Sequence, residues 1–248
     1  MGVPTLGCSC RVCTSQDPRD TRMRPSVAVE WEADGVTRRV LIDTGPDFRQ
    51  QALRFGIDHI DAVLYTHAHA DHILGLDDLR PLTFTRGKQK VPLYADAATA
   101  EVLERVFSYT LSENATYPTR ARVELRRLDG PAEVDGVRFI PVPLVHGRLE
   151  VTGYRFGNAA YLTDMSSIPE SSFPLLEGVD VVVLDALRPE PHPSHANIAD
   201  ATGWAKRLQA RESWFTHMSH EIMHAEMDPQ LAPSIRLAYD GLRVPIEL

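Results

Sequence analysis

Long apolar runs are missing from this chain of 248 residues. No stretch approaches the roughly 20 consecutive apolar residues that a membrane-spanning helix needs, so we expect no membrane partner. The amino terminus also lacks a basic segment followed by an apolar one, which is the mark of a secretory signal. The sequence therefore predicts a cytoplasmic protein.

An excess of positive charge is also missing, because the formal net charge is −8. A negative chain does not coat nucleic acid or an anionic membrane through bulk charge, so no bulk nucleic-acid binding is expected. A small anionic substrate stays compatible with this charge when local cations or metal ions hold it. The 43% of apolar residues is typical of a globular protein, and we interpret residues 1–248 as a single domain.

Cysteine is scarce, and all three cysteines lie within Cys8-Ser9-Cys10-Arg11-Val12-Cys13. An odd number crowded so tightly is a poor disulfide framework. In a reducing compartment such a cluster more often binds metal, and three thiolates can fill three corners of a zinc tetrahedron. The fourth ligand must then come from far away in the sequence. Loose reduced thiols are the alternative that the spacing leaves open.

Histidine, by contrast, is concentrated at one point. Three histidines and an aspartate lie within Thr66-His67-Ala68-His69-Ala70-Asp71-His72, directly after the apolar run Ala62-Val63-Leu64-Tyr65. The pattern predicts a strand whose exit loop carries metal ligands, since His67 and His69 point to the same side of an extended loop. Imidazole and carboxylate ligands suit zinc, iron or manganese. A cluster of surface histidines is the alternative explanation.

Turn and helix signals divide the rest of the chain. Hairpins are predicted at Asp34-Gly35, Asp135-Gly136 and Asp240-Gly241. Helices are predicted over Pro46–Phe55, Asp96–Phe107 and Ile198–Gln209. We interpret the polar segment Asp17–Pro25 as a solvated loop, with contact between its arginines and an anion as the alternative.

Separate predicted strands end in a potential metal ligand. These strand-end residues are His67, His146, Asp164 and His217. Asp185 follows another predicted strand, over 179–184. In layered α/β proteins, ligand sites gather where strands end and loops begin. Four potential ligands at strand ends, in a chain that also carries the histidine motif, rarely occur by chance. We therefore expect them to lie together in an α/β fold.

The motif and the strand-end residues resemble the metallo-β-lactamase superfamily, whose hallmark is the His-x-His-x-Asp-His loop. The resemblance covers essentially the whole chain and implies a four-layer αββα sandwich with two metal ions. It implies that His67, His69 and His146 hold one ion, that Asp71, His72 and His217 hold the other, and that Asp164 bridges them. Asp43 then matches a residue that holds a ligating histidine in place.

A closer resemblance is to the subgroup that contains the phosphoribosyl 1,2-cyclic phosphate phosphodiesterase. It is carried by Gly2–Cys13, Asp185–His195 and Thr216–His220. It implies a zinc knuckle within residues 1–25, in which Cys8, Cys10, Cys13 and His220 bind structural zinc, with His224 as the alternative fourth ligand. The subgroup normally begins with a further strand that is missing before Gly2. Either the start is assigned too far downstream or the strand is dispensable.

The resemblance implies a dinuclear metal-dependent phosphodiesterase for a small cyclic or nucleotide-like phosphodiester. A metal-bridging hydroxide would attack, His195 would be the general acid, and Asp71 would be a catalytic residue as well as a ligand. Zinc or manganese, with iron as a further option, would fill the site. The alternatives are a thioester hydrolase or nuclease of the same superfamily and a non-catalytic metal-binding carrier. The sequence leaves open the natural substrate and whether the protein is a homodimer.

Overall fold

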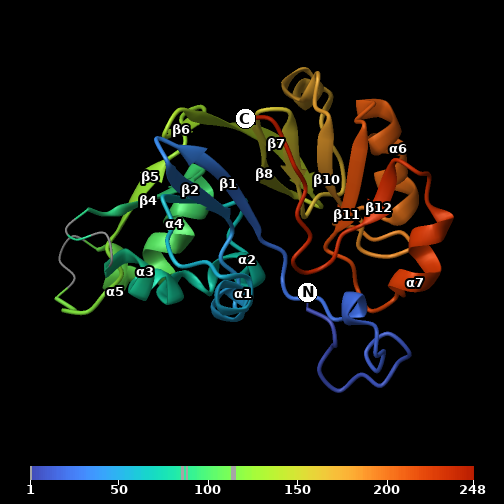
Figure 1. The fold of residues 1–248 in the computed structure, drawn as a ribbon, viewed down its shortest axis with the longest axis horizontal. Helices are drawn as coiled ribbons and strands as arrows, with labels where there is room; N and C mark the ends of the chain where they lie inside the picture. Colours follow the sequence, from blue (N-terminus) through green and yellow to red (C-terminus); the bar gives the residue numbers. More distant parts are fainter. Residues whose placement is uncertain (1, 85–86, 88, 113–115) are drawn as a thin grey trace. The chain divides into compact units, whose positions relative to one another are not determined.

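The computed structural model describes residues 2–84, 87, 89–112 and 116–248. Met1 lies outside these residues, so whether it is the true start of the chain stays open. The chain forms two compact units (Figure 1), Arg24–Phe139 and Met1–Met23 joined with Ile140–Leu248. Each unit combines helices with β-strands, which confirms the α/β fold class. The single domain over residues 1–248 stays a prediction. Across the described ranges, no helix is both long and apolar enough to cross a membrane.

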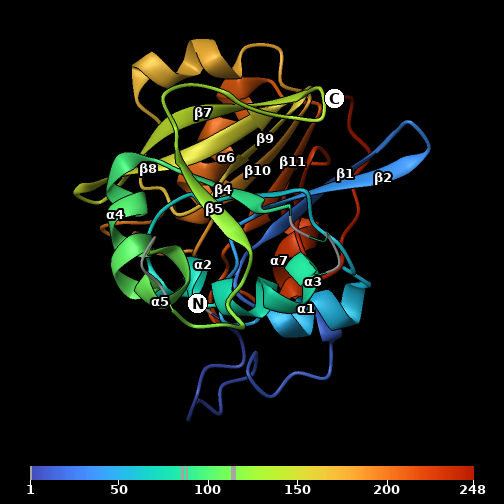
Figure 2. The same cartoon turned by 90° about the vertical axis from the view of Figure 1, so that its left-hand side faces the viewer.

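The unit Arg24–Phe139 is built around a sheet with the strand order β1-β2-β3-β4-β5. Its strands are β1 (Val27–Ala33), β2 (Val36–Ile42), β3 (Ala62–Leu64), β4 (Val91–Ala95) and β5 (Val123–Arg127), followed by β6 (Ala132–Val134). Its helices are α1 (Phe48–Phe55), α2 (Ala70–Ile73), α3 (Arg80–Phe84), α4 (Ala97–Val106) and α5 (Ser108–Leu111). The strands from β2 to β5 are parallel, and α4 packs against β4 and β5 (Figure 2). Buried Leu41, Val63, Leu93 and Leu103 form the centre of this core.

The other unit contains most of a second sheet, which has the order β12-β11-β10-β9-β8-β7-β6. In this sheet β6 pairs with the first residues of β7. Its strands are β7 (Val137–His146, which begins in the first unit), β8 (Leu149–Phe156), β9 (Ala159–Leu162), β10 (Val181–Asp185), β11 (Glu212–Thr216) and β12 (Ile235–Leu237). Its helices are α6 (Ile198–Leu208) and α7 (His224–Met227). The strands from β9 to β12 are parallel, and α6 lies against β10 (Figure 1).

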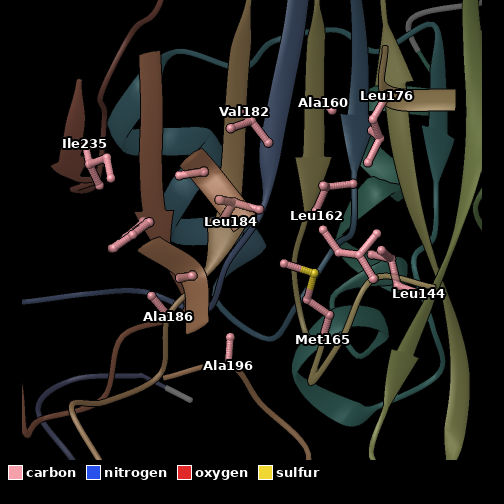
Figure 3. Close-up of a cluster of buried hydrophobic side chains, with 14 of the residues drawn as sticks. Leu144, Ala160, Leu162, Met165, Leu176, Val182, Leu184, Ala186, Ala196 and Ile235 are labelled. Atoms are coloured by element: carbon pink, nitrogen blue, oxygen red, sulfur yellow. The ribbon is translucent and has the colours of Figure 1, made fainter. Parts of the chain in front are cut away.

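The second sheet is anchored by an apolar core beneath β9 and β10. Leu162 and Leu184 are fully buried there and lie among Leu144, Met165 and Ala196 (Figure 3). Burying one such leucine contributes about 1.5–3 kcal/mol relative to leaving it exposed. Leu162 is the last residue of β9 and Leu184 the last but one of β10, so the core also fixes the loops that follow these strands.

Most of the turn and helix predictions are confirmed. Asp34-Gly35 joins β1 to β2, and Asp135-Gly136 joins β6 to β7, each through the predicted two-residue turn. The predicted helices correspond to α1, α4 and α6, although α1 begins at Phe48 rather than at Pro46.

The third hairpin prediction, at Asp240-Gly241, is wrong, because no strand follows β12 within the described chain to Leu248. The Asp240 carboxylate instead accepts a hydrogen bond from the backbone N–H of Met23 (3.1 Å). Pro245 follows shortly after and lacks the N–H that a paired strand would donate.

Candidate metal centres

The histidine motif directly follows β3, as its sequence predicts. Nε2 of His67 lies 2.9 Å from Nδ1 of His69, so two ring nitrogens converge on one point. Asp71 and His72 belong to the short helix α2, whose first turn follows His69. His72 is completely buried, and its Nε2 lies 4.0 Å from Oδ2 of Asp71. The motif residues therefore lie together within this unit.

Asp43 lies directly behind the motif, at the end of β2. Its Oδ2 is 2.7 Å from Nδ1 of His72, and both side chains are fully buried. The carboxylate also accepts hydrogen bonds from the backbone N–H and the hydroxyl of Thr66, each at 2.8 Å. Burial raises the pKa of Asp43, while His72 and Thr66 act in the opposite direction. Because Nδ1 of His72 faces a carboxylate, Nε2 is the ring atom that can bind a metal ion.

Two glycines allow the loop after β2 to pack against the backbone around α2. A Cβ atom at Gly45 would collide with the carbonyl of Asp71, and one at Gly75 would collide with the carbonyl of Gly45. The backbone N–H of Thr44 donates to the carbonyl of His72 (2.8 Å), and that of Gly75 donates to the carbonyl of Thr44 (2.8 Å). The absence of side chains at both positions thus allows the close approach, and the two hydrogen bonds fix the motif relative to Asp43.

In the other unit, polar side chains gather at the carboxyl ends of the parallel strands β9, β10 and β11. Nε2 of His217 lies 3.3 Å from Oδ1 of Asp164, and both residues are buried. Both adopt a left-handed backbone conformation, with φ of 52° at Asp164 and 58° at His217. Asp43, at the end of β2, has φ of 64°. The potential ligand atoms of Asp164, His195 and His217 lie within 4.8 Å of one another.

Asp185, the last residue of β10, completes this group and was not predicted as a site residue. Its Oδ2 lies 2.8 Å from Nδ1 of His195, and its side chain is fully buried. Burial raises the pKa of Asp185 well above its usual range; the charge of Asp164 adds to this, and His217 opposes it. The signal that could have identified Asp185 is its strand-end position, which it shares with Asp164 and His217.

His146 ends β7 and is oriented by the loop that carries His195. Its Nδ1 donates to the backbone carbonyl of Ser194 at 2.6 Å, which leaves Nε2 as the atom that can bind a metal ion. Its ring centroid lies 4.6 Å from that of His195, which in turn is stacked on His217 at 4.8 Å. These nitrogen and carboxylate donors match the ligand preferences of zinc, manganese and iron.

A separate candidate centre lies at the cysteines. The Sγ atoms of Cys10 and Cys13 are 3.8 Å and 3.4 Å from Nδ1 of His220, and Cys8 belongs to the same group. A zinc tetrahedron with Zn–S bonds of about 2.3 Å has edges of about 3.8 Å, so the spacing fits this ion. A hydrogen bond from the Cys13 amide lowers the pKa of Cys10 to about 7, which favours the thiolate that a metal needs.

The alternative fourth ligand, His224, lies elsewhere. Its ring is buried and faces Tyr239 with the ring centroids 6.1 Å apart, and it is not among the residues grouped around the cysteines. The structure therefore places His220, and not His224, next to the three thiols.

Comparison with known proteins extends these observations. Residues 38–218 match a family model described as "Beta-lactamase superfamily domain". A crystal structure described as a new diphosphatase from the PhnP family is 52% identical, with a TM-score of 0.91, and the match covers 100% of this chain and 94% of that one. The Zn²⁺-bound PqqB of Methylobacterium extorquens is 21% identical, with a TM-score of 0.73 over 99% of this chain and 96% of that one, which is a likeness of fold.

An octanoyltransferase of Porphyromonas gingivalis is 38% identical over 250 residues. That match covers 99% of this chain but 49% of the relative, so the chain spans about half the length of that protein.

Proposed function

Since the chain belongs to the PhnP family within the beta-lactamase superfamily, we propose that it is a dinuclear metal-dependent hydrolase of a small cyclic or nucleotide-like phosphodiester. The relative described as a diphosphatase supports hydrolysis at phosphorus. The observation that carries the proposal is the His195–Asp185 pair, which adds a proton donor to a set of metal ligands.

The ligand assignment follows the family resemblance. We assign the active-site ions to His67, His69, Asp71 and His72 from one unit and to His146, Asp164 and His217 from the other. Two divalent ions, zinc or manganese with iron as a further option, would lower the pKa of a bound water and offset charge on the attacking and leaving oxygens. The cysteines and His220 would hold a structural zinc ion. Asp43 and Ser194 fix the orientation of His72 and His146, so that the ligand atoms are set before an ion binds.

His195 is assigned as the general acid. Its Nδ1 faces Asp185, so the proton that it gives to the leaving oxygen comes from Nε2. A sugar alkoxide is a poor leaving group and needs this proton, whereas an activated phenolate does not. The proposal therefore predicts a dependence on His195 that grows with the basicity of the leaving group.

The test is a hydrolysis panel with metal content measured on the same sample. The panel contains bis(4-nitrophenyl) phosphate, a ribose cyclic phosphate, a nucleoside diphosphate, a thioester and a β-lactam. We expect about two ions per active site, a further zinc at the cysteines, and turnover of the phosphodiesters. Full metal content without hydrolysis of any ester would instead support the carrier function, and turnover of the thioester alone would support a thioester hydrolase.

The transfer activity named for the Porphyromonas gingivalis relative is not part of this proposal, because about half of that protein lies outside the match. The cytoplasmic location stays a prediction of the sequence, and a homodimer stays an open alternative.

A further inference from the structure

Arg22 closes the loop that carries the cysteines. Its backbone N–H donates to the carbonyl of Val3 and its carbonyl accepts from the N–H of Val3, both at 2.8 Å. Cys8, Cys10 and Cys13 all lie between these two paired residues. The position of the Arg22 backbone and that of the cysteine loop are therefore linked.

The side chain of Arg22 reaches a distant segment of the same unit. Its Nη1 donates to the carbonyl of Ser219 at 3.0 Å, and its Nη2 donates to the carbonyl of Ile222 at 2.8 Å. These two carbonyls flank His220, the candidate zinc ligand, and Ser219 is two residues beyond His217, the candidate active-site ligand. One guanidinium thus holds the segment that connects the two candidate centres.

A buried carboxylate keeps this guanidinium in place. Asp20 is 2% exposed and Arg22 is 6% exposed, and Oδ1 of Asp20 lies 3.2 Å from Nη2 of Arg22. The same carboxylate accepts hydrogen bonds from the backbone N–H of His224 (2.8 Å) and the hydroxyl of Ser15 (2.7 Å). A buried ion pair with this many hydrogen-bond partners is held in a single geometry, so a shift of one bonded segment also shifts the others.

We propose that Arg22 is a positioning residue that couples the cysteine centre to His217, so that the active-site ion bound by His217 depends on the state of the cysteine loop. The inference rests on the proposed function only for the assignment of His217 as a ligand. Because the guanidinium holds the carbonyls on both sides of His220, loosening it frees the segment that begins at His217. Residues that hold metal ligands in place typically change metal affinity by about 10–100-fold when they are replaced.

Cobalt titration of the metal-free full chain tests this coupling without any substrate. A cobalt ion bound by thiolates shows a sulfur-to-metal charge-transfer absorption, whereas one bound by nitrogen and oxygen ligands does not, so the two centres are read separately. In Arg22→Gln we expect the thiolate signal to persist, because all three cysteines and the backbone pairing of residue 22 with Val3 remain, and we expect an active-site affinity lowered by about 10–100-fold. Arg22→Lys keeps the charge but has a single ammonium group that cannot donate to both carbonyls as the guanidinium does. Its loss of active-site cobalt affinity should be intermediate.

Arg11→Gln is the matched control. Arg11 also lies in the cysteine loop and forms an ion pair with Glu226 at 2.6 Å, but these side chains are 76% and 55% exposed. We expect this variant to bind cobalt at both centres like the wild type.

Wild-type affinity of the active site in Arg22→Gln would overturn the proposal, and so would an equal loss at both centres, which indicates a general structural role. If Arg22→Gln does not fold, judged by its circular dichroism, Arg22→Lys decides by the same criteria. Failure of the hydrolysis panel leaves these binding measurements intact, so the two proposals fail separately.

Discussion

Nδ1 of His195 lies 2.8 Å from Oδ2 of the fully buried Asp185. The carboxylate orients the imidazole and leaves Nε2 as the ring nitrogen that the proposed acid role requires. Asp185 is itself held by the backbone N–H of Met165, which donates to the same Oδ2 at 3.0 Å. The pair is therefore arranged before any substrate binds.

His195→Gln should lower the turnover of a phosphodiester with an alkoxide leaving group by about 10²–10⁴-fold. Turnover of a 4-nitrophenyl diester should change much less, because its leaving group needs no proton. Initial rates on both substrates, with metal content measured in parallel, check this expectation. Unchanged turnover of the alkoxide substrate would remove His195 from the role of acid.

Asp43→Asn should lower the metal affinity by about 10–100-fold, because an amide nitrogen would then face Nδ1 of His72. Because Asp43 is fully buried, the free energy of unfolding of this variant should also fall by about 1–3 kcal/mol. Titration with zinc and denaturant unfolding measure the two effects. Ser26→Ala is the control: it removes a hydroxyl bond to the backbone carbonyl of Asp43 (2.8 Å) and leaves the carboxylate and its partners in place, so it should cost about 0.5–1.5 kcal/mol and leave the affinity nearly intact. Equal affinities for Asp43→Asn and the wild type would contradict the orienting role.

Gly45→Ala should destabilise the protein by about 1–3 kcal/mol and weaken metal binding, because the added methyl group meets the backbone carbonyl of Asp71. Gly203→Ala is the control, since its added methyl group meets nothing within 4 Å and the residue lies inside α6. That variant should gain about 0.8–1 kcal/mol from helix propensity. Thermal unfolding with and without zinc distinguishes the two, and a neutral Gly45→Ala would show that the motif can shift.

Cys10 of the metal-free protein should react with iodoacetamide in a pH-dependent way, with half of the maximal rate near pH 7, because the Cys13 amide lowers its pKa to about 7. A lowered pKa in the fold means that this hydrogen bond stabilises the protein above the ordinary thiol pKa, and that the contribution is lost as the pH falls through about 7. Zinc should protect Cys10 from the reagent. Mass spectrometry of each cysteine peptide gives the rates, and reaction that is insensitive to zinc would exclude Cys10 as a ligand.

The sequence reveals much of the fold because its strongest signals are local. Alternation around Asp34-Gly35 predicts a turn that needs no tertiary partner, and the strand ends at Asp164 and His217 follow from short apolar runs. The incorrect hairpin prediction at Asp240 shows the limit of such signals. The carboxylate of Asp240 accepts a hydrogen bond from the backbone N–H of Met23, which is far away in the sequence.

The burial of charged side chains cannot be predicted from the local sequence. The segment Asp17–Pro25 reads as a solvated loop, yet Asp20 and Arg22 within it are buried and paired. The burial of Asp20 and Arg22 depends on contacts with Ser219, Ile222 and His224, about 200 residues further along the chain, which local composition does not reveal. The sequence places Asp185 at a strand end and in the Asp185–His195 stretch of the family resemblance, but does not predict it as the partner of His195.

The left-handed backbone at Asp43, Asp164 and His217 has a consequence for engineering. Aspartate and histidine enter this region more readily than most residues, yet a non-glycine residue in a sparsely populated conformation costs of order 1–3 kcal/mol. Glycine at Asp164 or His217 would relieve that cost while it removed a proposed ligand. Selection of variants for heat resistance alone, without metal or substrate present, would therefore favour an inert scaffold over a working enzyme.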